Sequence, residues 1–147
     1  MCVRRFLSLP IAAALLGILA STVGCGDANM GRVHGTVTLD GQPLDGAMVT
    51  FAPAEGGGRP AAGRTDNRGR YQLVFSRDAR GAMVGPHTVS ISTYSEVPGE
   101  DGNDQVIPER VPAQYNVNSD LTRNVERGSN EFNFDLQSDG EIITHIE

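Results

Sequence analysis

Lysine and tryptophan are absent from this sequence, and aromatic residues are few. All twelve residues of the Lys+Arg count are arginines, and aromatic residues make up 5% of the 147 positions. Without lysine the chain cannot form a Schiff base, a P-loop lysine contact or a Lys–Asn isopeptide cross-link. One alternative function is that of a carbohydrate-binding module. Such modules use rows of exposed aromatic rings, so the missing tryptophan and the count of three tyrosines argue against it.

Positive charge is also scarce. The chain carries 18 acidic residues against its arginines and has a formal net charge of −6. Two of the arginines, Arg4 and Arg5, lie in the expected leader described below, so the mature chain carries −8. Such an acidic chain lacks the basic surface that nucleic acids require, and we expect no nucleic-acid partner.

Residues 1–24 have the three parts of an export signal. Arg4 and Arg5 form the positive region, an apolar stretch of residues 6–20 follows, and the segment ends Thr22-Val23-Gly24-Cys25. This ending resembles the bacterial lipobox, with Thr22 in place of the usual leucine. The resemblance implies cleavage between Gly24 and Cys25 and attachment of a diacylglycerol and an acyl chain such as palmitate to Cys25.

The cysteine count favours lipidation of Cys25. Cys2 leaves with the leader, so Cys25 has no partner for a disulfide. The alternative is an ordinary thiol beside an ordinary signal-peptidase site. Several acyl chains give stable anchoring, so we expect a protein held on the cell membrane or outer membrane and facing the periplasm or the exterior. The linker of residues 25–31 spans about 20 Å at full extension and keeps the domain near the bilayer.

From Arg32 onward apolar residues alternate with polar ones, as in half-buried strands. Turn signals at Asp40–Gly41, at Asp66–Gly69 and at residues 128–130 separate these runs. We expect an all-β domain over residues 32–137, folded as a seven-stranded antiparallel β-sandwich, with residues 138–147 as a C-terminal tail. The side chains predicted to face the core are Val37, Val49, Phe51, Tyr71, Leu73, Val89, Ile91, Phe132 and Phe134.

Four segments carry a family resemblance. They are VHGTVTLDGQPLDGAMVTF at residues 33–51, Thr65-Asp66-x-x-Gly69-x-Tyr71, GPHTVSI at residues 85–91, and VPAQYN at residues 111–116. Together they resemble the carboxypeptidase regulatory-like, or transthyretin-like, domain, and in particular the small lipoproteins of planctomycete-type bacteria. The resemblance covers about residues 32–137 and implies a prealbumin-like sandwich. Its motifs specify hairpins and core packing and imply no reaction.

The residues that could carry catalysis are scattered along the chain. His34, His87 and His145 lie on different segments without metal-ligand spacing. Transthyretin-like hydrolases of 5-hydroxyisourate use histidines, an arginine and a C-terminal Tyr-Arg-Gly-Ser motif, which this chain lacks. We therefore predict that the domain is not an enzyme and takes no cofactor or metal, with an accessory hydrolase as the alternative.

A long polar connection, residues 95–118, is the predicted binding loop. Tyr94, Arg110 and Tyr115 are its candidate contacts, because loops on a rigid scaffold often carry function. Its acids Glu96, Glu100, Asp101 and Asp104 could suit calcium, but their spacing does not match an EF-hand. A solvated acidic loop is the favoured interpretation.

Six arginines fall within 22 residues, which gives this stretch a local excess of +4. They could hold an acidic polysaccharide or a lipid phosphate. The alternative, which we favour here, is that arginine simply replaces lysine as the ordinary surface cation. These residues are Arg59, Arg64, Arg68, Arg70, Arg77 and Arg80.

The expected function is therefore that of a non-catalytic structural or binding module in the cell envelope. Its partners would be the membrane, through Cys25, and a protein or glycan of the envelope.

Overall fold

The computed structural model describes residues 29–100 and 102–143. The predicted leader, the cleavage site at Gly24 and Cys25, Asp101 and His145 lie outside the described residues. Within them the regular structure consists of twelve strands and one 3₁₀ turn, η1 (Ala113–Tyr115). No helix among these residues is long and apolar enough to cross a membrane.

The first strand, β1 (Met30–Leu39), is the centre of a six-stranded sheet. Its inward positions Gly31, Val33, Gly35 and Val37 are buried and alternate with exposed or half-buried polar residues, as the period of two predicts. Along one side β1 pairs in turn with three short antiparallel strands, which are β6 (Ala82–Met83), β5 (Arg70–Gln72) and β2 (Gln42–Pro43).

On its other side β1 pairs in parallel with β11 (Gly128–Glu131) and β12 (Phe134–Leu136). This corrects two predictions, namely that pairing is antiparallel throughout and that residues 128–130 form a turn. The chain reaches β11 from the other sheet rather than through a hairpin with β1, and such a crossover permits parallel pairing. The predicted number of seven strands is also too low, because β1 has several short partners along its length.

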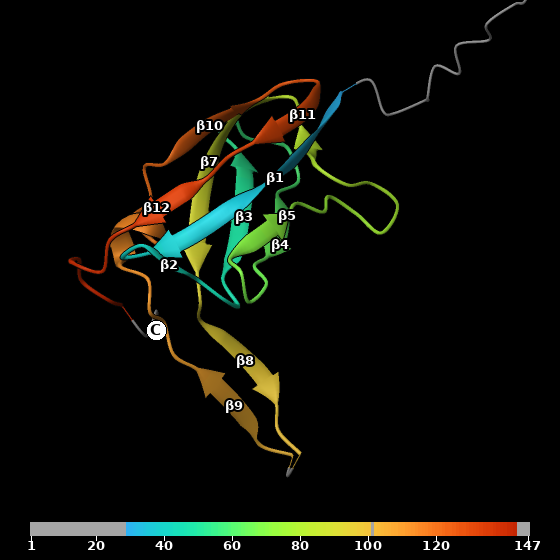
Figure 1. The fold of residues 1–147 in the computed structure, drawn as a ribbon. Coiled ribbons are helices and arrows are strands. Elements are labelled where there is room, and N and C mark those ends of the chain that lie inside the picture. Colours follow the sequence, from blue (N-terminus) through green and yellow to red (C-terminus); the bar gives the residue numbers. More distant parts are fainter. Residues whose placement is uncertain (1–28, 101, 144–147) are drawn as a thin grey trace, which may run out of the picture.

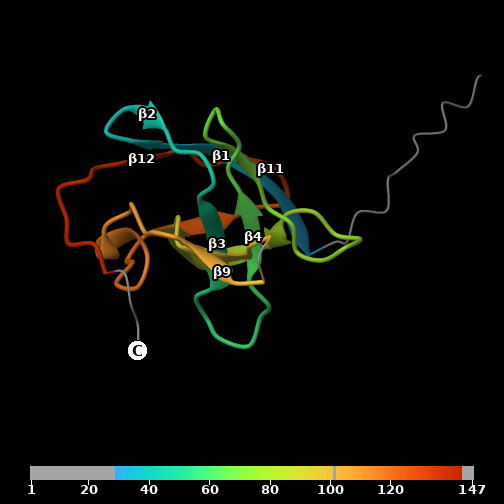
Figure 2. The ribbon, with the colours of Figure 1, turned by 90° about the horizontal axis from the view of Figure 1, so that it is seen from below.

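The second sheet has four antiparallel strands in the order β10-β7-β3-β4. Figure 2 shows this sheet and the six-stranded sheet in separate layers. Side chains from both sheets belong to one hydrophobic cluster, so they share a core. The strands are β3 (Met48–Pro53), β4 (Ala61–Arg64), β7 (Gly85–Ser92) and β10 (Thr122–Val125).

Phe51 of the four-stranded sheet contacts the aromatic rings of the other sheet. Its ring centre lies 5.8 Å from that of Phe132 and 6.4 Å from that of Phe134. Eight of the nine predicted core residues are at most 4% exposed, which confirms their assignment. Phe132 is only partly buried, at the edge of the same cluster. The period of two therefore assigned the inner face correctly in every tested strand.

The remaining two strands form a separate hairpin. β8 (Ser95–Pro98) pairs antiparallel with β9 (Asp104–Ile107) and with no strand of the larger sheets. Figure 1 shows this hairpin extending from the lower end of the molecule, whereas β1 begins at the upper right. Much of the connection predicted as a loop is thus an ordered hairpin that projects from the body of the domain.

Candidate functional site

The acidic hairpin, as we call residues 95–107, is the most prominent surface feature. Its cross-strand pairs are Ser95–Ile107, Glu96–Val106, Val97–Gln105 and Pro98–Asp104. All four residues of β9 are exposed, and Val106 and Ile107 are the large apolar ones among them. The outer edges of a two-stranded ribbon keep unpaired backbone donors and acceptors, which another strand can bind.

The charge of this hairpin has a single sign. The residues from Tyr94 to Pro108 include Glu96, Glu100, Asp101 and Asp104 and no arginine or histidine. Glu96 lies on β8 and Asp104 on β9, at opposite ends of the ladder. The described residues contain no group of three His, Cys, Asp or Glu side chains suited to a metal ion.

A buried carboxylate, Glu109, closes the base of the hairpin. Its Oε1 accepts hydrogen bonds from the backbone nitrogens of Thr93, Arg110 and Val111 at 2.8, 3.0 and 2.9 Å. The Thr93 hydroxyl also donates to Oε1, at 2.9 Å, and the Ser92 hydroxyl donates to Oε2. The carboxylate therefore joins the chain entering the hairpin to the chain leaving it.

These donors favour the ionised form of Glu109. Burial raises the pKa of its carboxyl, but the hydrogen bonds from Ser92, Thr93 and Val111 lower it by more, so the net shift is downward. Sequence reasoning missed this residue. The available signal was its position next to Arg110 in a short segment bounded by Pro108 and Pro112.

The three predicted contact residues of the loop do not form one site. Tyr94 is exposed before β8 and its hydroxyl donates to Glu96 at 2.6 Å, which raises the pKa of the phenol. Arg110 donates from Nη2 to the backbone oxygen of Asp45 at 2.6 Å and so attaches the base of the hairpin to the segment before β3. Tyr115 lies in η1, partly buried against the core.

A second surface feature is an open groove on the outer face of the six-stranded sheet. It is lined by His34 and Thr36 of β1, by Arg70 and Gln72 of β5, and by Glu131 of β11. The register places Gln72 and Glu131 on either side of His34. This row is polar and exposed, and His34 is its one histidine.

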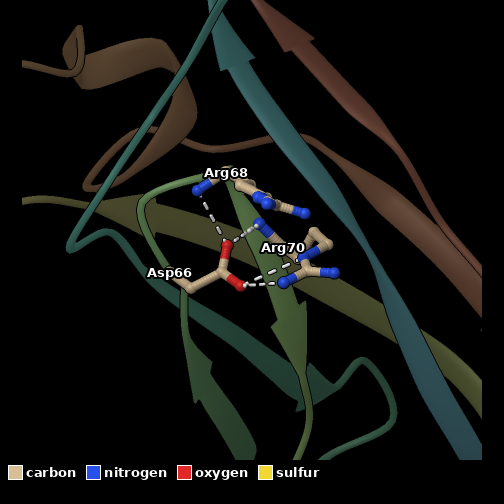
Figure 3. Close-up of polar contacts among 3 residues, drawn as sticks. All are labelled: Asp66, Arg68 and Arg70. Atoms are coloured by element: carbon tan, nitrogen blue, oxygen red, sulfur yellow. Dashed lines mark hydrogen bonds and ion pairs between the residues drawn. The ribbon is translucent and has the colours of Figure 1, made fainter.

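Asp66 holds the turn that leads into this groove (Figure 3). Its Oδ1 accepts from the backbone nitrogens of Arg68 and Arg70, both at 2.9 Å, and its Oδ2 pairs with the Arg70 guanidinium at 2.9 and 3.0 Å. These bonds lower the pKa of Asp66, the backbone bond from Arg70 most strongly. Arg70 is thereby held over the groove.

The histidines are kept apart by the fold. His87 lies on β7, is 2% exposed, and bonds through Nδ1 to the Gly85 oxygen at 3.0 Å. His87 is therefore a buried residue of the four-stranded sheet. His34 is exposed on the other sheet. A catalytic pair of these two residues has no support in this arrangement.

The predicted arginine cluster is divided. Arg64, Arg68 and Arg70 flank the turn between β4 and β5, which lies against the far end of β1 because the Gly69 oxygen accepts from Val37 at 2.8 Å. The chain then returns to the start of β1, where Ala82 pairs with Gly31. The cluster is thus spread along β1 from its far end to its start, and Arg80, which donates to the Gln72 side chain of β5, lies between the two groups.

Comparisons with known proteins give only distant similarity. No family model matches the sequence, and no curated protein matches it. A 9R-lipoxygenase from Cyanothece is 12% identical with a TM-score of 0.44, over 74% of this chain and 16% of that protein. A DUF3823 family protein from Parabacteroides merdae is 14% identical with a TM-score of 0.39, over 75% of this chain and 47% of that protein. The chain thus spans less than half the length of each.

Proposed function

We propose that this protein is a lipid-anchored, non-catalytic β-sandwich domain of the cell envelope that presents the acidic hairpin to a partner protein. The observation that carries the proposal is the placement of the hairpin at the end of the molecule opposite the start of β1 (Figure 1). An anchor at Cys25 lies only five residues before Met30 along the chain. Anchored there, the domain directs its hairpin away from the bilayer.

The hairpin suits a binding role because it is held firmly and is unpaired along its outer edges. Five hydrogen bonds to Glu109 and the bond from Arg110 to Asp45 fix its base. Because the base is fixed, the hairpin loses less conformational entropy when it binds a partner. The partner that fits is a positively charged, extended protein segment, because strand addition uses the free backbone edge and the carboxylates attract cations.

The finer fold assignment belongs to this proposal. Two layers that share one core support a prealbumin-like sandwich, and the motifs at residues 33–51 and 65–71 support the carboxypeptidase regulatory-like family and its planctomycete-type lipoproteins. The proposed sandwich includes a parallel pairing of β1 with β11 and β12.

Anchoring is tested by the Cys25→Ala variant. Fractionation should move the protein out of the membrane fraction, and the leader should stay uncleaved. Mass spectrometry of the parent should find a diacylglyceryl, N-acylated Cys25 as the first residue. An unmodified first residue at another position would reject the anchor.

Partner binding is tested by placing a photo-cross-linker at Asn103, near the tip of the hairpin, and at Asn67, in the turn between β4 and β5, as a matched control. Both side chains are exposed. We expect a discrete protein adduct from Asn103 alone, lost when Glu96 and Asp104 become Gln and Asn. A glycan adduct would favour the carbohydrate-binding alternative. Hydrolysis of ester, glycoside, phosphoester or ureide substrates that depends on His34 would favour the hydrolase.

A further inference from the structure

Five exposed arginines gather around the start of β1, and we call them the β1-start patch. Arg32 lies on β1 itself, and Arg127 precedes Gly128, the register partner of Gly31. The others lie in the loops on either side of β4 and β5 that return to this end, next to Met83 and Ala82. The members of the patch are Arg32, Arg59, Arg77, Arg80 and Arg127.

This end of the molecule has the opposite charge to the rest. The acids in the same loops are Glu55, Asp78 and Glu126, so these segments carry a net charge of +2, or +1 with Asp27 of the linker, in a mature chain of −8. The turn that carries Arg64 and Arg68 lies beside Val37, six steps along β1 from Gly31 and thus about 20 Å from it, whereas Arg70 pairs with Thr36, about 13 Å along β1 from Arg32. The acidic hairpin projects from the opposite end (Figure 1). Positive charge therefore lies at the end of the domain next to the proposed anchor, and negative charge lies at the end with the hairpin.

Within residues 29–100 and 102–143 the guanidinium groups of the patch have few hydrogen-bond partners. Among the described residues the one salt bridge joins Arg70 to Asp66, outside the patch. Arg80 makes a single long bond to the Gln72 side chain, at 3.3 Å, and the Arg59 guanidinium lies 6.0 Å from the centre of the Phe75 ring. Val74, beside Phe75 in this loop, is 48% exposed. Arginines next to exposed apolar side chains are the composition of a membrane-surface contact.

We propose that the β1-start patch binds the phosphate groups of anionic lipids and so holds the domain upright on the bilayer. The inference rests on the proposed lipid anchor, because the short linker of residues 25–31 is what brings this end within reach of the headgroups. Arginine binds phosphate through two parallel N–H donors. The acidic remainder of the chain is repelled by the same surface, and the hairpin is directed outward.

The test uses the mature lipoprotein purified from membranes, after mass spectrometry has verified lipidated Cys25. An Asn103→Cys substitution supplies the one free thiol for a fluorophore, and acceptor dyes are placed in the headgroups of vesicles. We expect less energy transfer in phosphatidylcholine vesicles that contain phosphatidylglycerol than in phosphatidylcholine alone. The Arg77→Gln/Arg80→Gln pair should lose this difference. Removal of each arginine should lower the ratio of upright to tilted molecules roughly fivefold, the equivalent of about 1 kcal/mol.

The matched control is Arg64→Gln/Arg68→Gln, which removes the same charge from the other end and should keep the difference. Equal energy transfer in both kinds of vesicle, with normal lipidation of Cys25, would reject lipid binding by the patch without affecting the proposed anchor. Unlipidated Cys25 would overturn the proposed function and this inference with it. Inorganic phosphate that abolishes the effect at millimolar concentration, or dextran sulfate that binds the patch more tightly than the vesicles do, would assign it to a free anion or a polysaccharide instead.

Discussion

Glu109 bonds to Thr93 twice across the base of the hairpin. Its Oε1 accepts from the backbone nitrogen of Thr93 at 2.8 Å and from its hydroxyl at 2.9 Å, over a sequence separation of 16 residues. Both residues are buried, at 7% and 2% exposure. A long polar connection becomes an ordered element because one buried carboxylate satisfies donors on both of its strands.

Removing this carboxylate should loosen the hairpin first. Glu109→Ala leaves the backbone nitrogens of Thr93 and Val111 buried without an acceptor, and each such donor costs about 1–3 kcal/mol. We expect a total loss of about 3 kcal/mol or more in the free energy of unfolding. Hydrogen exchange should speed up most at Thr93 and Val111. Glu96→Ala, which removes an exposed carboxylate on β8, is the control and should change little. Unaltered exchange at Thr93 would contradict the assigned role.

The same residue predicts how stability depends on pH. The pKa of Glu109 is lower in the folded protein than in the unfolded chain, so its ionised form stabilises the fold above the unfolded value of 4.5. This contribution is lost as the pH falls through the lowered folded pKa. Glu109→Gln should therefore show a smaller loss of stability in acid than the parent. Chemical denaturation at a series of pH values between about 6 and 3 measures the difference. Equal slopes for both proteins would count against an ionised Glu109.

Asp66 should stabilise its turn both as a hydrogen-bond acceptor and through the charge of its ion pair. In Asp66→Asn the Oδ1 acceptor for the Arg68 and Arg70 amides is retained, while the ion pair with Arg70 is lost. In Asp66→Ala both are lost. Amide exchange at Arg70 should therefore rise slightly in the Asn variant and more in the Ala variant. An NMR titration of the parent should find the Asp66 carboxyl ionising below its usual range. Identical exchange in the two variants would show that the turn does not need the acceptor.

Gly35 should tolerate no side chain. A Cβ at this position would overlap the backbone carbonyl of Phe132, which belongs to the segment joining β11 to β12. Gly35→Ala must displace that segment from β1, and we expect loss of the folded state or a large fall in melting temperature. Gly41→Asn is the control. Gly41 has a φ of 79° in an open turn, and asparagine adopts such angles readily. Comparable melting of Gly35→Ala and the parent would contradict this packing.

Phe134 should be a major contributor to the core. It is 3% exposed, and its ring centre lies 6.3 Å from that of Tyr71, while the Arg123 guanidinium lies 4.8 Å above it. Phe134→Ala should cost about 3–5 kcal/mol through the cavity that it leaves. Val74→Ala, at a position 48% exposed, should cost much less. Thermal or urea denaturation compares the two, and a Phe134→Ala variant that melts with the parent would place this residue outside the core.

The inner face of the domain and its main turns follow from local sequence patterns. Val33, Val37, Val49 and Ile91 are buried because strand side chains alternate between two faces, and this period can be read without knowing any partner strand. The Asp40–Gly41 turn was equally readable, because both residues take positive φ, 51° and 79°, and few residue types accept such angles.

Which strands pair, and which side chains lie between them, depends on contacts that no local pattern records. The parallel pairing of β1 with β11 depends on a crossover from the other sheet, and no local pattern records that direction. Weak alternation in residues 95–107 hid the hairpin, because both faces of β9 are exposed and no hydrophobic period marks them. Glu109 and Thr93, like the arginines at the start of β1, acquire their roles through contacts between segments far apart in the chain. The strength of those contacts depends on burial and on strand register, and both arise only when the two sheets pack together.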